Sequence, residues 1–133
     1  MLRACSHLVV ATDDVPKMTH FFSSLFEINP YFENKEFSEF VLPSRFRIAF
    51  FRPVGASAKH FKSTQERGGL GIGLTVENVD SIYDKAKGMA GTQVSGPPKE
   101  HPWGEKSFLL IDPDGNRWEL TQSPSTDGML VNR

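Results

Sequence analysis

Two segments of the chain place apolar residues at helical spacing. Apolar residues recur every three or four positions through residues 15–26 and again through residues 79–90, so both segments are predicted to form amphipathic helices. Asp14 and Asn78 stand directly before them and are suitable N-caps, because a side-chain oxygen can accept hydrogen bonds from the free N–H groups of a first turn. Pro16 is tolerated in that turn, and Gly91 is expected to follow the end of the second helix.

Other apolar residues alternate with polar ones over short segments, which is typical of β-strands. One strand is predicted before each helix, with Leu8 and Val10 on its core face in the first half and Ile72, Leu74 and Val76 in the second. Three more are predicted after each helix, at 30–34, 37–42 and 45–52 in the first half and at 93–95, 106–111 and 117–122 in the second. Both halves therefore follow the order βαβββ. We interpret them as an internal repeat, the alternative being chance similarity between two short amphipathic units.

The segment Asp-Pro-Asp-Gly-Asn at residues 112–116 combines residue types that favour turns, and alternation resumes directly after it. This pattern predicts a hairpin that leads into a strand. Trp118 and Leu120 are expected in the core, which leaves Glu119 on the opposite face. A carboxylate there needs a partner or water, because an unpaired buried charge is strongly destabilising. Arg47 or His7 is the expected partner, and pairing in a solvated cleft, with Arg47 or with Arg117 of the same strand, is the simpler alternative.

Composition and charge narrow the functional classes. The 133 residues are long enough for one domain with a core. The net charge is -1, from 15 basic and 16 acidic residues, which gives no electrostatic basis for binding nucleic acid or an anionic membrane. Cys5 is the single cysteine, so an intramolecular disulfide is excluded and a cytoplasmic location is expected. No signal peptide or membrane span is predicted. The glycine-rich residues 68–73 open a strand and not a helix, which argues against a phosphate loop.

Three features together resemble the vicinal oxygen chelate superfamily. They are the paired βαβββ modules, a first-strand histidine (His7) followed by a helix signature from Asp14 to Phe22, and the D-P-D-G-N-x-x-E-L hairpin. This superfamily includes glyoxalase I, extradiol dioxygenases, fosfomycin-resistance enzymes and bleomycin-resistance proteins. The resemblance extends over about residues 6–122, and residues 97–104 resemble the P-W-G loop of the bleomycin-resistance and uncharacterised glyoxalase-like branches.

The resemblance implies an α+β fold in which each module curls a mixed sheet into a half-cup with its helix on the convex side. It implies one domain over residues 1–133, with a first module at about 5–52, a linker at 53–68, a second module at about 69–122 and a C-terminal tail at 123–133. It also implies a homodimer in which each cavity takes one module from each subunit. A small-molecule ligand is then the expected partner.

Strand alternation decides which side chains line the inside of each half-cup. The expected positions combine polar groups with small residues, and small residues leave volume for a ligand. The residues expected to contact it are His7, Arg47, Phe51, Trp103, Ser107, Leu109, Arg117 and Glu119. Phe40 is expected to stack on a planar ligand together with Phe51 and Trp103.

In metal-dependent members of the superfamily, four inward positions supply the ligands. The resemblance places His7, Ala49, Gly71 and Glu119 at these positions, so only two donors remain. Catalytic sites usually keep three protein ligands and an open position, and the candidates for a third are His101, Cys5 and His60, none at a position that the family uses. We therefore expect no cofactor, although Zn, Ni, Mn or Fe bound weakly by His7 and Glu119 stays an alternative.

Three functional hypotheses follow. The first is a metal-free binding protein of the bleomycin-resistance type, which buries an organic molecule in a cavity at a dimer interface. The second is a metal-dependent lyase, isomerase or transferase of the glyoxalase type, in which Glu119 is a ligand or a base. The third is a structural or interaction domain with an unused cleft. We rank the binding protein first, and the sequence leaves the question of catalysis open.

Overall fold

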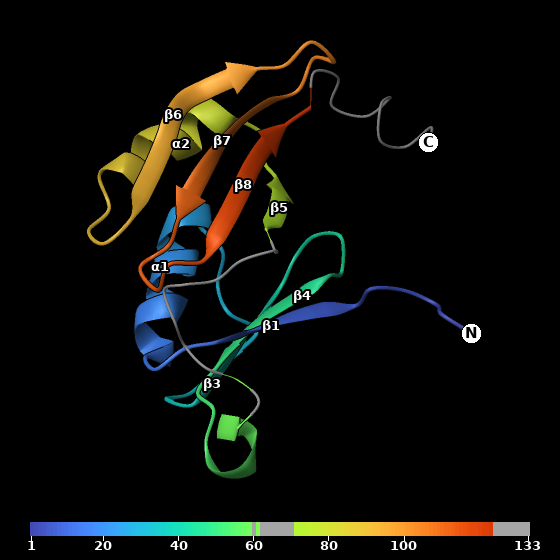
Figure 1. Cartoon of the computed structure of the whole chain (residues 1–133), viewed down its shortest axis with the longest axis vertical. Helices are drawn as coiled ribbons and strands as arrows, with labels where there is room; N and C mark the ends of the chain where they lie inside the picture. The colour runs from blue at the N-terminus through green and yellow to red at the C-terminus, as the bar shows by residue number, and fades with distance from the viewer. Residues whose placement is uncertain (60, 62–70, 124–133) are drawn as a thin grey trace. The chain divides into compact units, whose positions relative to one another are not determined.

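A computed structural model of the chain describes residues 1–59, 61 and 71–123. The chain divides into two compact units, Met1–Thr64 and Gln65–Arg133. Each unit contains one α-helix and one four-stranded mixed sheet that forms a half-cup (Figure 1). The prediction of an α+β fold built from two βαβββ modules is confirmed.

The first module follows the predicted order of strand, helix and three strands. Its elements are β1 (His7–Ala11), α1 (Val15–Phe26), β2 (Phe32–Glu33), β3 (Phe37–Val41) and β4 (Arg47–Phe51). The sheet order is β1-β4-β3-β2, in which β1 runs parallel to β4 and the other neighbours are antiparallel. The second strand is much shorter than the predicted 30–34, because only two of its residues pair with β3.

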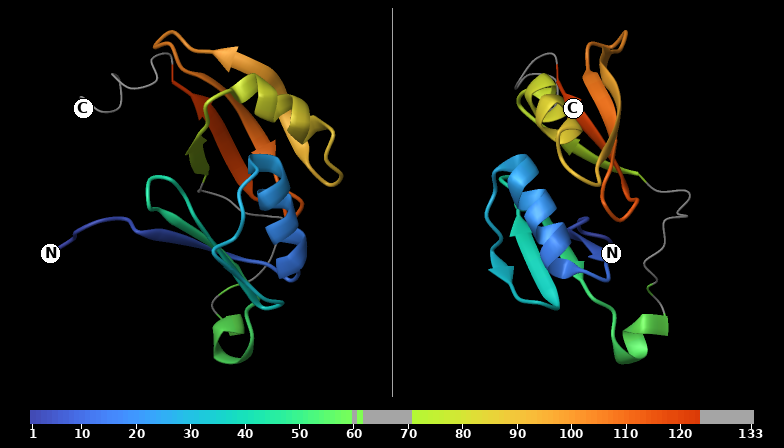
Figure 2. Two further views of the ribbon diagram at one scale, coloured as in Figure 1. Left: turned by 180° about the vertical axis from the view of Figure 1, so that it is seen from behind. Right: turned by 90° about the vertical axis from the view of Figure 1, so that its left-hand side faces the viewer.

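Helix α1 covers one face of this sheet (Figure 2). Its predicted bounds are confirmed, and the Asp14 side chain caps it by accepting a hydrogen bond from the Lys17 amide at 3.0 Å. Phe22 packs on Phe40 and Phe50 from the sheet, with ring centroids 4.7 and 5.9 Å away. Phe40 is fully buried in this core. The expectation that Phe40 stacks on a ligand is wrong, because alternation along β3 turns its ring toward the helix.

The second module repeats this arrangement. Its elements are β5 (Ile72–Thr75), α2 (Val79–Lys87), β6 (Gln93–Glu100), β7 (Lys106–Ile111) and β8 (Arg117–Gln122). The sheet order is β5-β8-β7-β6, with β5 parallel to β8 and the other pairs antiparallel. Helix α2 lies over β6, β7 and β8 (Figure 1). The predicted cap is confirmed, since the Asn78 side chain accepts from the Ser81 amide at 3.1 Å.

Two element boundaries in this module differ from the predictions. Helix α2 ends at Lys87 and not at residue 90, because the chain tightens there and the Gly88 amide bonds the Lys85 carbonyl three residues back. Strand β6 continues to Glu100, well beyond the predicted end at residue 95. Its prolines lie at an irregularity between Ser95 and Lys99 on the edge of the sheet, where missing N–H groups are tolerated.

The hairpin between β7 and β8 is organised by Asp112, which is only 2% exposed. One carboxylate oxygen accepts from the backbone amides of Asp114 and Asn116, both at 2.9 Å. The other accepts from the Asn116 side-chain amide and from the Trp118 indole N–H, both at 2.8 Å. The predicted hairpin is confirmed, and its first residue ties the turn to the largest side chain of the core.

The segment predicted as a linker contains a short 3₁₀ helix, η1 (Gly55–Lys59). The linker residues 60 and 62–68, like the tail beyond residue 123, lie outside the described residues, as does the third-ligand candidate His60. Among the described helices, none is long and apolar enough to cross a membrane.

Candidate functional site

The face of the first sheet opposite α1 carries the side chains that alternation predicted. His7 pairs with Arg47 across β1 and β4, and Ala49 pairs with Val9 on one side and with Glu39 on the other. Residues paired across neighbouring strands share a face of the sheet. Val9 is 42% exposed, so this face presents an apolar side chain to solvent beside charged groups.

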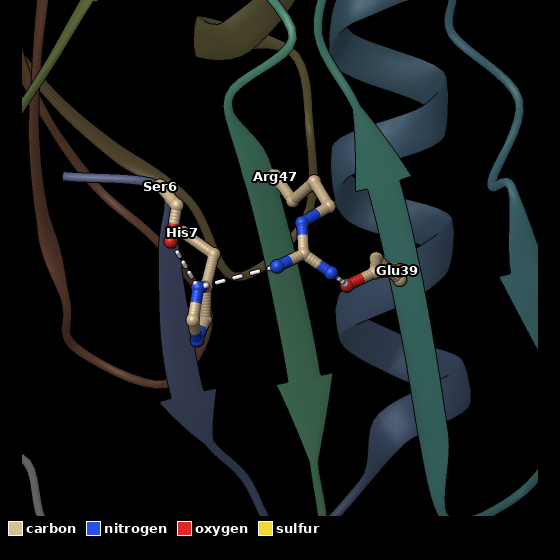
Figure 3. Close-up of polar contacts among 4 residues, drawn as sticks. All are labelled: Ser6, His7, Glu39 and Arg47. Atoms are coloured by element: carbon tan, nitrogen blue, oxygen red, sulfur yellow. Dashed lines mark hydrogen bonds and ion pairs between the residues drawn. The ribbon is translucent and has the colours of Figure 1, made fainter. Parts of the chain in front are cut away.

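Three polar side chains form a chain of contacts across this face (Figure 3). The Arg47 guanidinium lies between the other two, with Nη1 3.2 Å from Glu39 Oε2 and Nη2 3.3 Å from His7 Nδ1. The Ser6 hydroxyl is also 2.8 Å from His7 Nδ1. The Arg47 side chain is 42% exposed and the Glu39 side chain 16%. The first module thus holds an arginine in a fixed position on its open face.

Phe51 lies on the same face but has an aromatic neighbour in the linker. Its ring centroid is 4.9 Å from that of Phe61, and the two rings meet edge to face at 86°. Phe51 is half-buried. Stacking of Phe51 on a ligand stays a prediction, and the ring that would stack already contacts Phe61.

The second sheet shows the matching arrangement on the face opposite α2. Glu119 pairs with Gly73 on one side and with Leu109 on the other, and Ser107 pairs with Thr121. Glu119 is exposed and Leu109 is 36% exposed, whereas Trp118 is buried at 1%. The prediction that Glu119 faces the cup and Trp118 the core is confirmed. Pairing of Glu119 with Arg47 or His7 stays a prediction.

Gly71, just before β5, and Gly73, within it, leave room on this face because they carry no side chain. A Cβ added at Gly71 or Gly73 would meet no other described atom within 4 Å. Arg117 is exposed at the start of β8, two residues before Glu119 on the same strand, and its contact with a ligand stays a prediction. Small residues next to exposed charged groups provide volume and polarity together, as a ligand site requires.

The loop between β6 and β7 builds a second aromatic and polar group around Trp103. The His101 ring stacks on the indole with a centroid distance of 4.7 Å and an angle of 3°. The indole N–H donates to Glu105 Oε1 at 2.7 Å, and His101 Nε2 is 2.8 Å from the Ser107 hydroxyl. Trp103 is nevertheless 60% exposed. Its neighbours therefore hold a large aromatic surface in place while it remains accessible.

The four positions that the resemblance assigns to a metal site offer only two donor side chains. His7 and Glu119 could donate, but Ala49 and Gly71 offer only a methyl group and a hydrogen. Among the described residues, no group of three or more His, Cys, Asp or Glu could hold a metal ion. Cys5 is exposed, and His101 is engaged with Ser107 and Trp103.

Sequence reasoning missed Glu39 and Glu105 as members of these groups. Alternation along residues 37–41 already places Glu39 on the same face as Arg47, but only strand pairing brings it beside Ala49 and within reach of the guanidinium. Glu105 sits two residues from Trp103 in a loop, where no periodic pattern indicates the direction of a side chain.

Comparison with known proteins agrees with this architecture. A glyoxalase-related enzyme from Fulvimarina pelagi is 20% identical, with a TM-score of 0.76 over 92% of this chain and 90% of that one. A fosfomycin resistance protein from Listeria monocytogenes is 21% identical, with a TM-score of 0.70 over 92% and 95% of the two chains. A family enzyme from Burkholderia phytofirmans is 17% identical, with a TM-score of 0.70 over 88% and 96%. At these identities the likeness shows the fold alone.

No curated protein matches the chain in sequence. The sequence model of one family does match, over residues 4–120, which is most of the chain. The two half-cup modules, the hairpin and this match agree with one another. The chain belongs to the Glyoxalase/Bleomycin resistance protein/Dioxygenase superfamily.

Proposed function

We propose that this protein binds a small organic molecule on the open faces of its modules without a metal ion. The observation that carries the proposal is the arrangement of polar side chains on the sheet faces opposite the two helices, which are not part of the hydrophobic core. Arg47 is fixed by Glu39 and His7, and exposed Glu119 pairs with Gly73 of β5, which has no side chain. Fixed donors and acceptors next to open volume orient a ligand, and exposed apolar side chains contribute burial.

The cluster of side chains around Trp103 favours a planar ligand. Trp103 is held by a stacked imidazole and by a hydrogen bond to Glu105, so little conformational freedom is lost when a second ring stacks on it. Phe51 supplies a further aromatic surface in the first module. Arg47, Arg117 and Glu119 then orient the polar groups of the ligand, with Ser107 and Leu109 as further contacts.

The proposal includes a homodimer whose cavities each combine one module from each chain. Exposed Val9 and Leu109 support it, because apolar side chains on the open faces gain stability when another surface covers them. Sedimentation velocity at micromolar concentration is expected to give the mass of a dimer. A monomer at that concentration would contradict this part of the proposal.

A metal-dependent lyase, isomerase or transferase is the second candidate, and the retention of His7 and Glu119 is what favours it. It ranks lower because Ala49 and Gly71 cannot donate and because Arg47 places a positive charge 3.3 Å from the His7 ring. Metal analysis of protein purified without added metal separates the two. Stoichiometric Zn, Ni, Mn or Fe would overturn the metal-free proposal.

A thermal-shift screen with planar aromatic acids and amines tests binding itself. The best hit is expected to bind Glu119→Ala and Trp103→Ala about tenfold more weakly, since each change removes about 1–2 kcal/mol of ligand contact. Glu33→Ala is the matched control, because Glu33 pairs with Ser38 and so lies on the helix side of its sheet. Equal losses in Glu33→Ala and Glu119→Ala would refute a site at Glu119, and no hit at all would favour the scaffold hypothesis.

A further inference from the structure

The His7 ring has two neighbours at the same nitrogen. Arg47 Nη2 lies 3.3 Å from Nδ1 and the Ser6 hydroxyl lies 2.8 Å from it (Figure 3). The backbone supports this arrangement, because the Arg47 amide donates to the Ser6 carbonyl at 3.2 Å and His7 is paired with Arg47 in the sheet. The contact between the two side chains therefore rests on adjacent, hydrogen-bonded strands.

The chemistry of arginine decides the direction of this contact. A guanidinium carries only N–H donors, so Nδ1 of a hydrogen-bonded imidazole must be the acceptor. A neutral imidazole with an unprotonated Nδ1 carries its proton on Nε2. The Ser6 hydroxyl can donate to the same nitrogen. Both neighbours thus favour one tautomer, with Nε2–H directed away from Arg47.

Glu39 holds the Arg47 side chain in position through an ion pair. The carboxylate lies 3.2 Å from Nη1, on the strand that flanks Arg47 on the side away from His7. Arg47 is consequently held from both sides by groups on neighbouring strands. Its positive charge therefore lies between His7 and Glu39, which are the one imidazole and the one carboxylate in the described strands β1, β3 and β4.

We infer that Arg47 is a positioning residue that holds His7 as an Nε2–H hydrogen-bond donor, so that the first module presents a donor where metal-dependent relatives present a ligand. A metal at Nε2 needs a lone pair there and hence the other tautomer, which would turn an Nδ1–H toward the guanidinium. The fixed cation also repels a divalent ion. For the ligand of the proposed function, which this step assumes, the donor selects an oxygen acceptor such as a carboxylate or carbonyl.

The test is ¹⁵N NMR of ring-labelled, unliganded protein at about pH 8.5, where imidazoles are generally neutral. The His7 signals are identified by their loss in His7→Gln. We expect one tautomer, with protonated Nε2 and unprotonated Nδ1. An Nδ1–H tautomer or an even mixture in the native protein would overturn the inference. The measurement does not depend on ligand binding. The tautomer inference can therefore be refuted while the thermal-shift screen still finds a ligand, and it can be supported when the screen finds none.

Arg47→Met and Arg47→Lys separate positioning from a general structural role. Arg47→Met is expected to shift the ring toward a tautomer mixture, and Arg47→Met combined with Ser6→Ala, which removes both donors, is expected to shift it further. Arg47→Lys keeps a donor and should preserve the native pattern. An unchanged pattern in the double variant would overturn the inference. Added Zn²⁺ should leave the His7 signals of the native protein unmoved at equimolar concentration, and stoichiometric zinc binding at His7 would contradict it. Unchanged amide spectra away from the site confirm folding.

Discussion

The last hairpin of each module follows the same backbone path, through residues 42–46 in the first module and 112–116 in the second. In both, the first amide donates to the last carbonyl at 2.9 Å, and the fourth amide donates back to the first carbonyl at 2.8 or 2.9 Å. The fourth residue has a positive φ in both cases, 76° at Arg45 and 89° at Gly115. The backbone geometry of the repeat has therefore been kept while the residues differ.

The side chains that hold these two turns are not alike. Asp112 accepts four hydrogen bonds and links the turn to Trp118, whereas Leu42 stands at the matching position with an apolar side chain. Ile48 takes the place of Trp118 and is fully buried without any polar contact. One turn is stabilised by a buried carboxylate. The other has backbone bonds and one side-chain contact, in which the Phe46 amide donates to the Ser44 hydroxyl at 3.4 Å. This turn geometry therefore does not require the residues Asp-Pro-Asp-Gly-Asn.

The largest expected effect comes from Trp118→Ala. It leaves a large cavity and removes a donor from buried Asp112, so the free energy of unfolding should fall by about 3–5 kcal/mol. Glu119→Ala, one residue away on the exposed face, should change it by less than about 0.5 kcal/mol. Urea unfolding followed by circular dichroism measures both. Similar losses would mean that Glu119 belongs to the core and not to the open face.

The next largest effect on the free energy of unfolding is expected when the first residues of the two turns, Asp112 and Leu42, are exchanged. Asp112→Leu introduces the residue of the first module and leaves several buried donors without an acceptor, which should cost about 3 kcal/mol. The reciprocal change, Leu42→Asp, affects a half-buried residue in a turn that needs no carboxylate, and about 1 kcal/mol is expected. Equal losses in urea unfolding would show that the two turns depend on this position to the same degree.

The smallest expected effects concern the residues with positive φ. Gly115→Ala should destabilise the protein by about 1–2 kcal/mol, because a Cβ is disfavoured in the left-handed region. Arg45→Gly relieves that strain but increases the freedom of the unfolded chain, so it should lie within about 1 kcal/mol of the native protein. Thermal melts of both variants provide the measurement. A stabilising Gly115→Ala would disprove the equivalence of the two turns.

Residue patterns along the chain were enough to predict the order of elements and the face of the sheet on which most strand residues lie. Helical spacing and the caps Asp14 and Asn78 located both helices, and alternation placed Trp118 inside and Glu119 outside, because these features depend only on nearby residues. The predicted ends of elements were less accurate where a residue type is unusual in the element that contains it. Strand β6 passes its prolines only because it lies at a sheet edge, and sequence spacing does not reveal which strand will be an edge.

The contacts among side chains on the open faces could not be predicted without the order and register of the strands. The parallel pairing of β1 with β4 brings His7 to Arg47 over forty residues of chain, and the neighbouring β3 adds Glu39. Likewise, the loop after β6 folds His101 against Trp103 at a stacking distance that no periodicity indicates. Local patterns set the face of each residue, but contacts between distant strands depend on their order and register, which are properties of the whole sheet.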